Sequence, residues 1–172
     1  MKRILSLIAA AIMLFAAGCE KKTETQKNNP PIPKSFSTNA EITFRDLYMT
    51  ADLTVTEQEG FIVRMLTPEV LSPLEITCKN GVCSASYDGI SFSVEPDRFP
   101  QAAFVNTAAQ ALAYTLADVE LKKSIADGIV SYQGNTDSGV FVLTQDAESG
   151  ALLDLSVEGA QLHVVFKNFK TL

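Results

Sequence analysis

The sequence predicts a mainly β (α+β) domain: one large, curved antiparallel sheet, an open half-barrel, with a helix packed on its concave face. Three observations predict this fold class. Apolar and polar residues alternate with period two through most of residues 36–172, which is typical of strands with one buried face. Short turn-like segments separate these stretches, as in an antiparallel meander. Over residues 101–121, apolar residues instead recur at three- and four-residue spacing, which indicates a helix.

The first nineteen residues have the order of an export signal. Two basic residues precede an apolar run that reaches Phe15, and small residues then end in Cys19. The run is too short to span about 30 Å of hydrocarbon, so it predicts a cleaved signal peptide over residues 1–18. The Ala-Gly-Cys ending resembles the lipobox of bacterial lipoproteins, although Ala16 stands where leucine is usual. This resemblance implies that Cys19 is acylated, for example with palmitate; the alternative is an ordinary secretory signal with a chance cysteine.

The predicted location and the charge restrict the partners. We expect lipid on Cys19 to anchor the domain on the extracytoplasmic face of the cell membrane, or on an outer membrane in a diderm organism. The chain has 14 Lys and Arg against 20 Asp and Glu, and removal of Lys2 and Arg3 leaves 12 against 20, a net charge of −8. This balance argues against nucleic acid and anionic lipid surfaces as electrostatic partners. Residues 19–35 are polar with a proline-rich end, which predicts a flexible tether before the folded domain at 36–172.

The alternating stretches predict nine or ten strands on either side of the helix. They lie at 41–45, 52–56, 61–66, 74–79, 82–88, 90–95, 129–133, 140–144, 153–158 and 162–167. A sheet of this size curls rather than staying flat. The helix is rich in alanine and can fill the concave side, and Lys122 and Lys123 lie near its expected C-terminal end, where cations are favoured.

Cys78 and Cys83 remain after Cys19 is assigned to lipid, in an exported and oxidising compartment. They flank Asn80-Gly81, the strongest short-range hairpin signal. A two-residue type I′ turn would place the two cysteines opposite each other with Cα atoms about 4.5–5.5 Å apart, within disulfide reach. Both also lie on the apolar face of their strands. A metal site would have only two ligands and a redox-active pair would lack Cys-x-x-Cys spacing, so a structural disulfide is favoured.

The sequence contains no recognisable catalytic motif. It has no nucleophile elbow, Ser-x-x-Lys, His-Glu-x-x-His or P-loop pattern. His163 lies on the polar side of its strand without a patterned partner, which indicates a surface histidine. Asp146 and Glu148 beside Gly150 predict a turn rather than a calcium site. We therefore expect no enzyme, no cofactor and no metal.

Three stretches carry a resemblance to a known family: Phe61–Pro68, Leu74–Val94 and Gly150–Phe169. The first is an apolar strand followed by proline, ahead of a long hairpin, and the last is a glycine-linked final hairpin. Over nearly all of residues 36–172 the chain resembles the LolA/LolB half-barrel of periplasmic lipoprotein carriers and their lipid-anchored receptors. It also resembles mycobacterial and clostridial lipoproteins of that fold, one of them involved in spore germination. The resemblance implies a non-enzymatic protein that binds a lipid or a lipidated protein in an apolar cavity.

Two functions are compatible with these observations. The first is the binding of a ligand in an apolar cavity between sheet and helix. The alternative interpretation of the residues that would line this cavity is a filled hydrophobic core. The second is a protein-interaction adaptor of the cell envelope, for example an accessory of a germination or cell-wall enzyme. A continuous apolar void favours the first, whereas a packed interior with an exposed apolar patch favours the second. The expected cavity residues are Met49, Phe61, Met65, Phe92, Leu112, Leu116, Leu153, Leu155 and Phe166.

Overall fold

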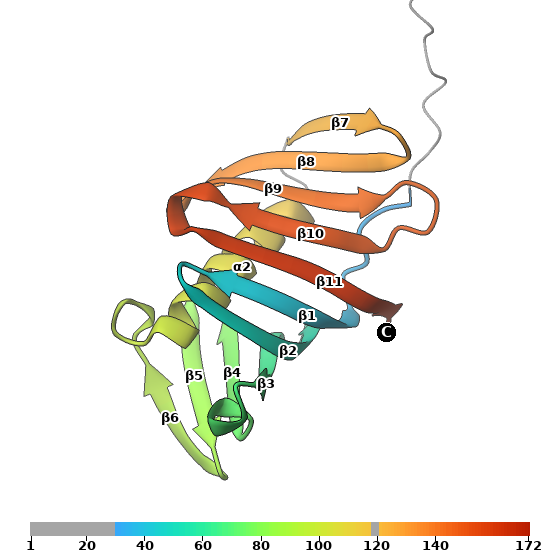
Figure 1. Ribbon diagram of the computed structural model, residues 1–172. Helices are drawn as coiled ribbons and strands as arrows, with labels where there is room; N and C mark the ends of the chain where they lie inside the picture. The colour runs from blue at the N-terminus through green and yellow to red at the C-terminus, as the bar shows by residue number, and fades with distance from the viewer. Residues whose placement is uncertain (1–29, 118–120) are drawn as a thin grey trace, which may run out of the picture.

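A computed structural model describes residues 30–117 and 121–172 (Figure 1). The signal peptide, the lipidation of Cys19 and the first part of the tether lie outside the described residues and stay predictions. The described residues form eleven strands in one antiparallel sheet, together with one α-helix and three short 3-10 helices. The predicted fold class is confirmed, because a large, open antiparallel sheet curves around a helix.

The strands form two antiparallel meanders connected by the helix α2 (Pro100–Leu116). The first meander consists of β1 (Phe36–Phe44), β2 (Leu47–Thr56), β3 (Gly60–Thr67), β4 (Leu74–Lys79), β5 (Val82–Tyr87) and β6 (Ile90–Val94). The second consists of β7 (Lys122–Ala126), β8 (Ile129–Thr136), β9 (Gly139–Asp146), β10 (Leu152–Val157) and β11 (Leu162–Thr171). Across the sheet the order is β6-β5-β4-β3-β2-β1-β11-β10-β9-β8-β7.

The first and last strands pair in the middle of the sheet. β1 runs antiparallel to β11, from the pair Phe36–Thr171 to the pair Phe44–Leu162. This pairing joins the meanders and places β6 and β7, the strands on either side of α2 in the chain, at opposite outer edges. The helix therefore crosses the concave face between the two halves of the sheet (Figure 1).

The tightest hairpin turns follow their sequence signals. Asn80-Gly81, Asp88-Gly89 and Asp127-Gly128 have positive φ at both residues, which is the backbone of a type I′ turn. This turn has the twist of the flanking strands, so it closes a hairpin without splaying them. Within β1 and β2, buried side chains alternate with partly exposed ones, as the period-two pattern predicts.

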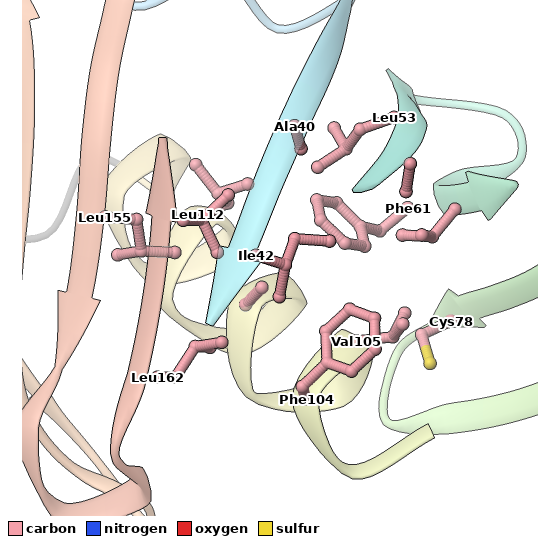
Figure 2. Close-up of a cluster of buried hydrophobic side chains, with 14 of the residues drawn as sticks. Ala40, Ile42, Leu53, Phe61, Cys78, Phe104, Val105, Leu112, Leu155 and Leu162 are labelled. Carbon is pink, nitrogen blue, oxygen red and sulfur yellow. The ribbon is translucent and has the colours of Figure 1, made fainter. Parts of the chain in front are cut away.

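The helix fills the concave side of both meanders. Pro100 stands in its first turn, where the missing N–H removes no helical hydrogen bond. Figure 2 shows α2 between Phe61 and Cys78 on one side and Leu155 and Leu162 on the other. The buried helix residues are Ala102, Phe104, Val105, Thr107, Ala108, Ala111 and Leu112.

Two details of the secondary structure differ from expectation. Residues 122–126 form β7, so the described part of the chain has eleven strands rather than nine or ten. Lys122 and Lys123 consequently belong to an edge strand and not to the last turn of the helix, which stops at Leu116. All five side chains of β7 are exposed. Period-two alternation needs one buried face, and so this strand left no pattern to detect.

An irregularity in β10 reverses the burial that alternation predicts for two neighbouring leucines. The pairing of β10 with β9 shifts register between Leu152 and Asp154. Leu152 is therefore buried, whereas Leu153 is only half-buried. Strict alternation places Leu153 on the inward face together with Leu155, and this expectation is wrong for Leu153. A bulge adds one residue to one strand, which reverses the faces of the residues before it.

The described end of the predicted tether contacts the second meander. The amide nitrogen of Gln145, a fully buried side chain on β9, donates to the carbonyls of Gly150 (2.9 Å) and Pro30 (3.2 Å). Its carbonyl oxygen accepts a hydrogen bond of 2.8 Å from the hydroxyl of Tyr132, and burial raises the pKa of this tyrosine. Ile32 packs against the hydrophobic core. These contacts hold the proline-rich segment on the domain.

Candidate functional site

A cavity of about 340 Å³ lies beside α2 on the concave side of the first meander. Its walls come from the helix, from the turn between β2 and β3, and from the hairpin of β4 and β5. One row of paired residues crosses the sheet below it: Val55 pairs with Phe61, Phe61 with Cys78, and Cys78 with Cys83. The cavity therefore occupies the space that α2 leaves over this row.

The floor of the cavity is apolar. On the sheet side it is lined by Val55, Phe61 and Cys78, all of which are buried. On the helix side Leu112 and Leu116 face it, together with the small side chains of Ala109 and Ala113. Because alanine ends at Cβ, these helix positions leave the space open rather than filling it.

Polar side chains surround the opening of the cavity. Lys34 and Glu57 form an ion pair of 3.4 Å, with side chains 71% and 61% exposed. Lys79 donates a hydrogen bond through Nζ to the backbone carbonyl of Gln58, which connects the two turns of the rim. The remaining polar lining side chains are those of Thr56, Asn80, Asn106 and Gln110. The rim thus carries two lysines against one carboxylate, in a chain whose formal net charge is −6.

Gly60 brings the two rim turns together. It begins β3 with φ +85° and also lines the cavity. A Cβ atom at this position would lie 2.7 Å from the carbonyl oxygen of Cys78 and 3.0 Å from the Cβ of Lys79. Only glycine combines this backbone conformation with so close an approach.

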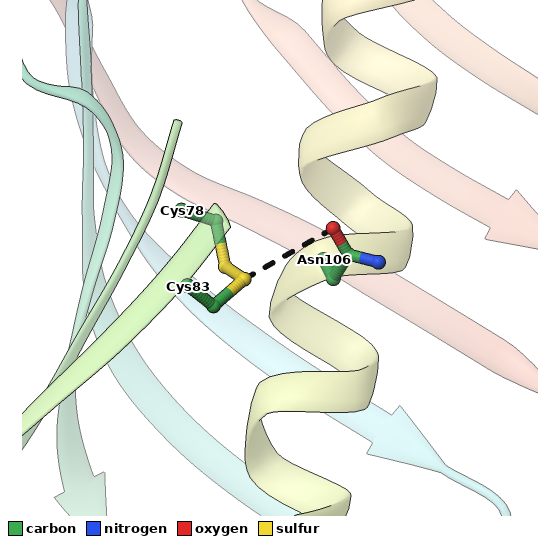
Figure 3. The surroundings of a disulfide bond; sticks show 3 residues. All are labelled: Cys78, Cys83 and Asn106. Atoms are coloured by element: carbon green, nitrogen blue, oxygen red, sulfur yellow. Dashed lines mark hydrogen bonds between the residues drawn. A yellow bond between two sulfur atoms is a disulfide. The ribbon is translucent and has the colours of Figure 1, made fainter. Parts of the chain in front are cut away.

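The predicted disulfide between Cys78 and Cys83 is present. The cysteines are directly opposite each other across the Asn80-Gly81 turn, with Cα atoms 4.2 Å apart. The side-chain oxygen Oδ1 of Asn106 on α2 lies 4.0 Å from Cys83 Sγ (Figure 3). The disulfide therefore braces the hairpin that forms one wall of the cavity.

We expect the double substitution Cys78→Ala and Cys83→Ala to lower the free energy of unfolding by about 2 kcal/mol, because the disulfide closes a short loop of the unfolded chain. Urea unfolding of both chains measures the difference. Dithiothreitol should destabilise the wild type by a similar amount and leave the double variant unchanged. A wild type that unfolds identically with and without reductant would contradict this role of the disulfide.

The structure places the predicted cavity residues in four different environments. Phe61, Leu112 and Leu116 line the cavity. A second group fills the core, and Leu153 is half-buried on β10. Phe92 on β6 is 44% exposed and lies outside the cavity, which differs from its predicted place. The second group consists of Met49, Met65, Leu155 and Phe166.

The sequence pattern did not single out the polar part of the site. Lys34 falls in the predicted tether, Glu57 falls in a turn and Lys79 ends a strand, and charged residues are ordinary at all three places. Asn106 and Gln110 lie on the helix without forming a motif. Only their common position around one opening distinguishes these residues, and no spacing in the chain encodes that position.

Outside the cavity, the described residues offer little for chemistry. The Asp146 carboxylate accepts hydrogen bonds from the hydroxyl (2.6 Å) and N–H (2.7 Å) of Ser149 and from the N–H of Glu148 (3.2 Å). These bonds lower the pKa of Asp146 and close the turn that the sequence predicts there. His163 is exposed. Within residues 30–117 and 121–172, no three His, Cys, Asp or Glu side chains are grouped as metal ligands.

Among the described residues, no helix has the length and apolar character needed to cross a membrane.

No family model and no curated protein matches this chain. Among solved structures it is similar to a LolA superfamily protein, NE2245, from Nitrosomonas europaea, with 12% identity over 84% of this chain and 88% of the other and a TM-score of 0.47. An uncharacterized conserved protein from Thermus thermophilus shares 10% identity over 82% and 80% of the two chains, with a TM-score of 0.46.

A third similar structure is LprF from Mycobacterium bovis, with 13% identity over 78% of this chain and 85% of the other and a TM-score of 0.35. A LolA superfamily protein and LprF are thus among the structural neighbours. At such low identities and TM-scores, the likeness says nothing of the family of this chain or of what it binds.

Proposed function

We propose that this protein binds one apolar chain of an amphiphilic ligand, such as an acyl chain, in the cavity beside α2. The single observation that carries the proposal is a void of about 340 Å³ with an apolar floor and a polar rim. Ligand sites in proteins are concave, largely apolar and equipped with a few polar groups that orient the ligand. The cavity has each of these properties.

The size of the cavity favours a single chain over a bulky lipidated protein. Binding sites typically enclose about 300–1,000 Å³, and this cavity lies at the lower end of that range. Met65, Leu155 and Phe166 already fill the remaining space between sheet and helix. The ligand would therefore lie between α2 and the two rim turns rather than along the whole concave face.

The rim favours a ligand with an anionic head group. Lys34 and Lys79 both lie at the opening, and the ion pair of Lys34 with Glu57 is largely exposed. Exposed ion pairs contribute only about 0–1 kcal/mol, so a carboxylate or phosphate can compete for the lysine. The polar side chains of Asn80, Asn106 and Gln110 would complete the hydrogen bonding at the head group.

The proposed setting is the cell envelope. Acylation of Cys19 would tether the domain to the extracytoplasmic face of a membrane, within reach of lipids or of lipidated proteins. Binding, and not catalysis, is the proposed activity, and it requires no cofactor. The alternative function, a protein-interaction adaptor, concerns a different surface, where Ile90 and Phe92 are exposed on β6.

The experiment is a chain-length series of saturated fatty acids, measured by displacement of a dansyl-labelled fatty acid from the full chain carrying Cys19→Ser. Each methylene that enters the cavity contributes about 0.8 kcal/mol, or about fourfold in affinity. Affinity should therefore rise steeply with length and level off when the cavity is full. A fatty alcohol should bind more weakly than the acid of equal length, because it lacks the carboxylate that the lysines would hold.

Ala109→Phe should weaken binding at least tenfold, since the new ring would occupy the cavity. Ala117→Phe is the matched control, because Ala117 is exposed beyond the end of α2 and does not line the cavity. Equal affinities for the two variants, or an affinity that does not depend on chain length, would contradict the proposal.

A further inference from the structure

The two outer edges of the sheet differ in how they are protected. β7 carries Lys122 and Lys123 on one edge, and lysines on an edge strand discourage pairing with another chain. β6 on the other edge has the sequence Ile-Ser-Phe-Ser-Val, with no charge and no proline. An uncharged edge strand of high β propensity is a template for a further strand.

The backbone of β6 has hydrogen-bonding groups that its neighbour does not use. β6 pairs with β5 across the two-residue turn Asp88-Gly89, from the pair Tyr87–Ile90 onward. In such a hairpin the residues that flank the turn exchange hydrogen bonds, and the bonded pairs then alternate along the ladder. The N–H and C=O groups of Ser91 and Ser93 therefore point away from β5, toward the open edge of the sheet.

The side chains of β6 add an apolar surface to this edge. Ile90 and Phe92 share the face of Ala85, the β5 residue that pairs with Phe92, and they are 71% and 44% exposed. Tyr87, next to Ile90 on β5, is 38% exposed. On the opposite face β6 presents two serines. A strand added here would gain backbone hydrogen bonds along the edge and apolar contacts on one face.

The charges around β6 indicate the kind of strand that fits. Asp88 precedes it, and Glu95 and Asp97 follow it. Arg98 pairs with Glu95 at 2.8 Å, and the described residues form no ion pair with Asp88 or Asp97. Both ends of the edge are therefore acidic, which favours a partner strand with basic ends.

The same charges disfavour a second copy of this chain. In an antiparallel pairing of two β6 strands centred on Phe92, Gly89 of one copy would lie opposite Glu95 of the other. The carboxylate of Asp88 in the first copy would then approach that of Glu95 in the second. Because of the two-fold symmetry, this approach of carboxylates would occur at both ends. Like charges that face each other across a strand pair are destabilising.

We propose that the open edge of β6 binds an extended segment of another protein, with alternating apolar residues and basic residues at its ends. The segment adds a strand beside β6, places its apolar side chains against Ile90 and Phe92, and sets its basic ends beside Asp88 and Asp97. This site is separate from the cavity and does not depend on a lipid ligand.

The test uses the full chain carrying Cys19→Ser and a synthetic peptide in which valine and threonine alternate between terminal lysines. Amide hydrogen exchange, followed by NMR, should show that saturating peptide slows exchange at Ser91 and Ser93 at least tenfold. A peptide with the same centre and terminal glutamates should bind at least tenfold more weakly at low ionic strength. Binding of the lysine-ended peptide should weaken as salt is added.

Ser93→Pro should abolish binding, because it removes an outward N–H that the fold does not use. Ile125→Pro is the matched control: it removes an outward N–H from the other edge strand, and the affinity for the peptide should stay unchanged. Phe92→Thr keeps the strand propensity of β6 and should weaken binding at least fivefold, which tests the site without proline.

Any of four results overturns the proposal. The first is that the amides of Ser91 and Ser93 gain no protection at millimolar peptide, and the second is that a folded Ser93→Pro chain binds as tightly as the wild type. The third is that the glutamate-ended peptide binds as well as the lysine-ended one. The fourth is that the chain alone forms dimers that protect these two amides. Fatty-acid binding is measured on the same samples, so failure here is distinguishable from failure of the cavity.

Discussion

Truncation of Phe104 to alanine is expected to lower the free energy of unfolding by about 3–5 kcal/mol, the range for aromatic residues in a packed core. Phe104 is 1% exposed on α2, and its ring centroid lies 6.1 Å from that of Phe44 on β1. The substitution would leave a hole between the helix and the middle of the sheet. Protein interiors are close-packed and relax only in part, so the lost contacts are not recovered.

Urea unfolding measures this effect, with Tyr48→Ala as the control. Tyr48 is an aromatic residue on β2 with 62% exposure, and its truncation should change stability by about 0.5 kcal/mol or less. If the two substitutions had equal effects, α2 would not be packed against the sheet as the structure shows.

Gly60→Ala is expected to lower the free energy of unfolding by about 3 kcal/mol, through two separate causes. The first is the φ of +85°, which an L-residue adopts with strain. The second is the contact of the new Cβ with the carbonyl of Cys78 at 2.7 Å. Because backbone atoms cannot yield as a flexible side chain does, the turns would have to separate, and the cavity rim would lose the contact between Lys79 and Gln58.

Gly81→Ala separates the two causes. Gly81 has nearly the same conformation, with φ +78°, and a Cβ there would meet nothing within 4 Å. Its substitution should therefore show the backbone strain alone, about 1 kcal/mol. Chemical denaturation of both variants compares the values, and a Gly60→Ala effect no larger than that of Gly81→Ala would show that the approach of the two turns does not contribute.

The features that were predicted correctly depend on short stretches of chain. Asn80-Gly81 was sufficient to predict the hairpin, and the register of that turn was sufficient to pair Cys78 with Cys83. Alternation assigned Phe61 and Leu155 to the inner face of the sheet, where both are buried. Each of these predictions uses a turn or a period that acts over a few residues.

The features that were predicted wrongly or not at all depend on the position of a neighbouring strand or helix. Phe92 lies on the same face as buried Ala85, as alternation indicates, but it stays exposed because none of residues 30–117 and 121–172 covers that part of β6. Leu153 was assigned inward because a bulge leaves no mark in the alternation before it. The cavity itself arises where small helix residues face the sheet, and only the path of α2 decides which alanines those are.

Patterns within the sequence were sufficient to predict the faces of most strands, the tight hairpin turns, the disulfide and the helix that the structure describes between two runs of strands. Local sterics, turn chemistry and burial periodicity carry this information, because they act between near neighbours in the chain. The pairing of β1 with β11, the path of α2 across the concave face, the grouping of lysines at one opening and the exposure of β6 among the described residues depend instead on the tertiary structure. These features bring together residues far apart in the chain, such as Phe44 and Leu162, and such contacts form only when the whole sheet closes around its core.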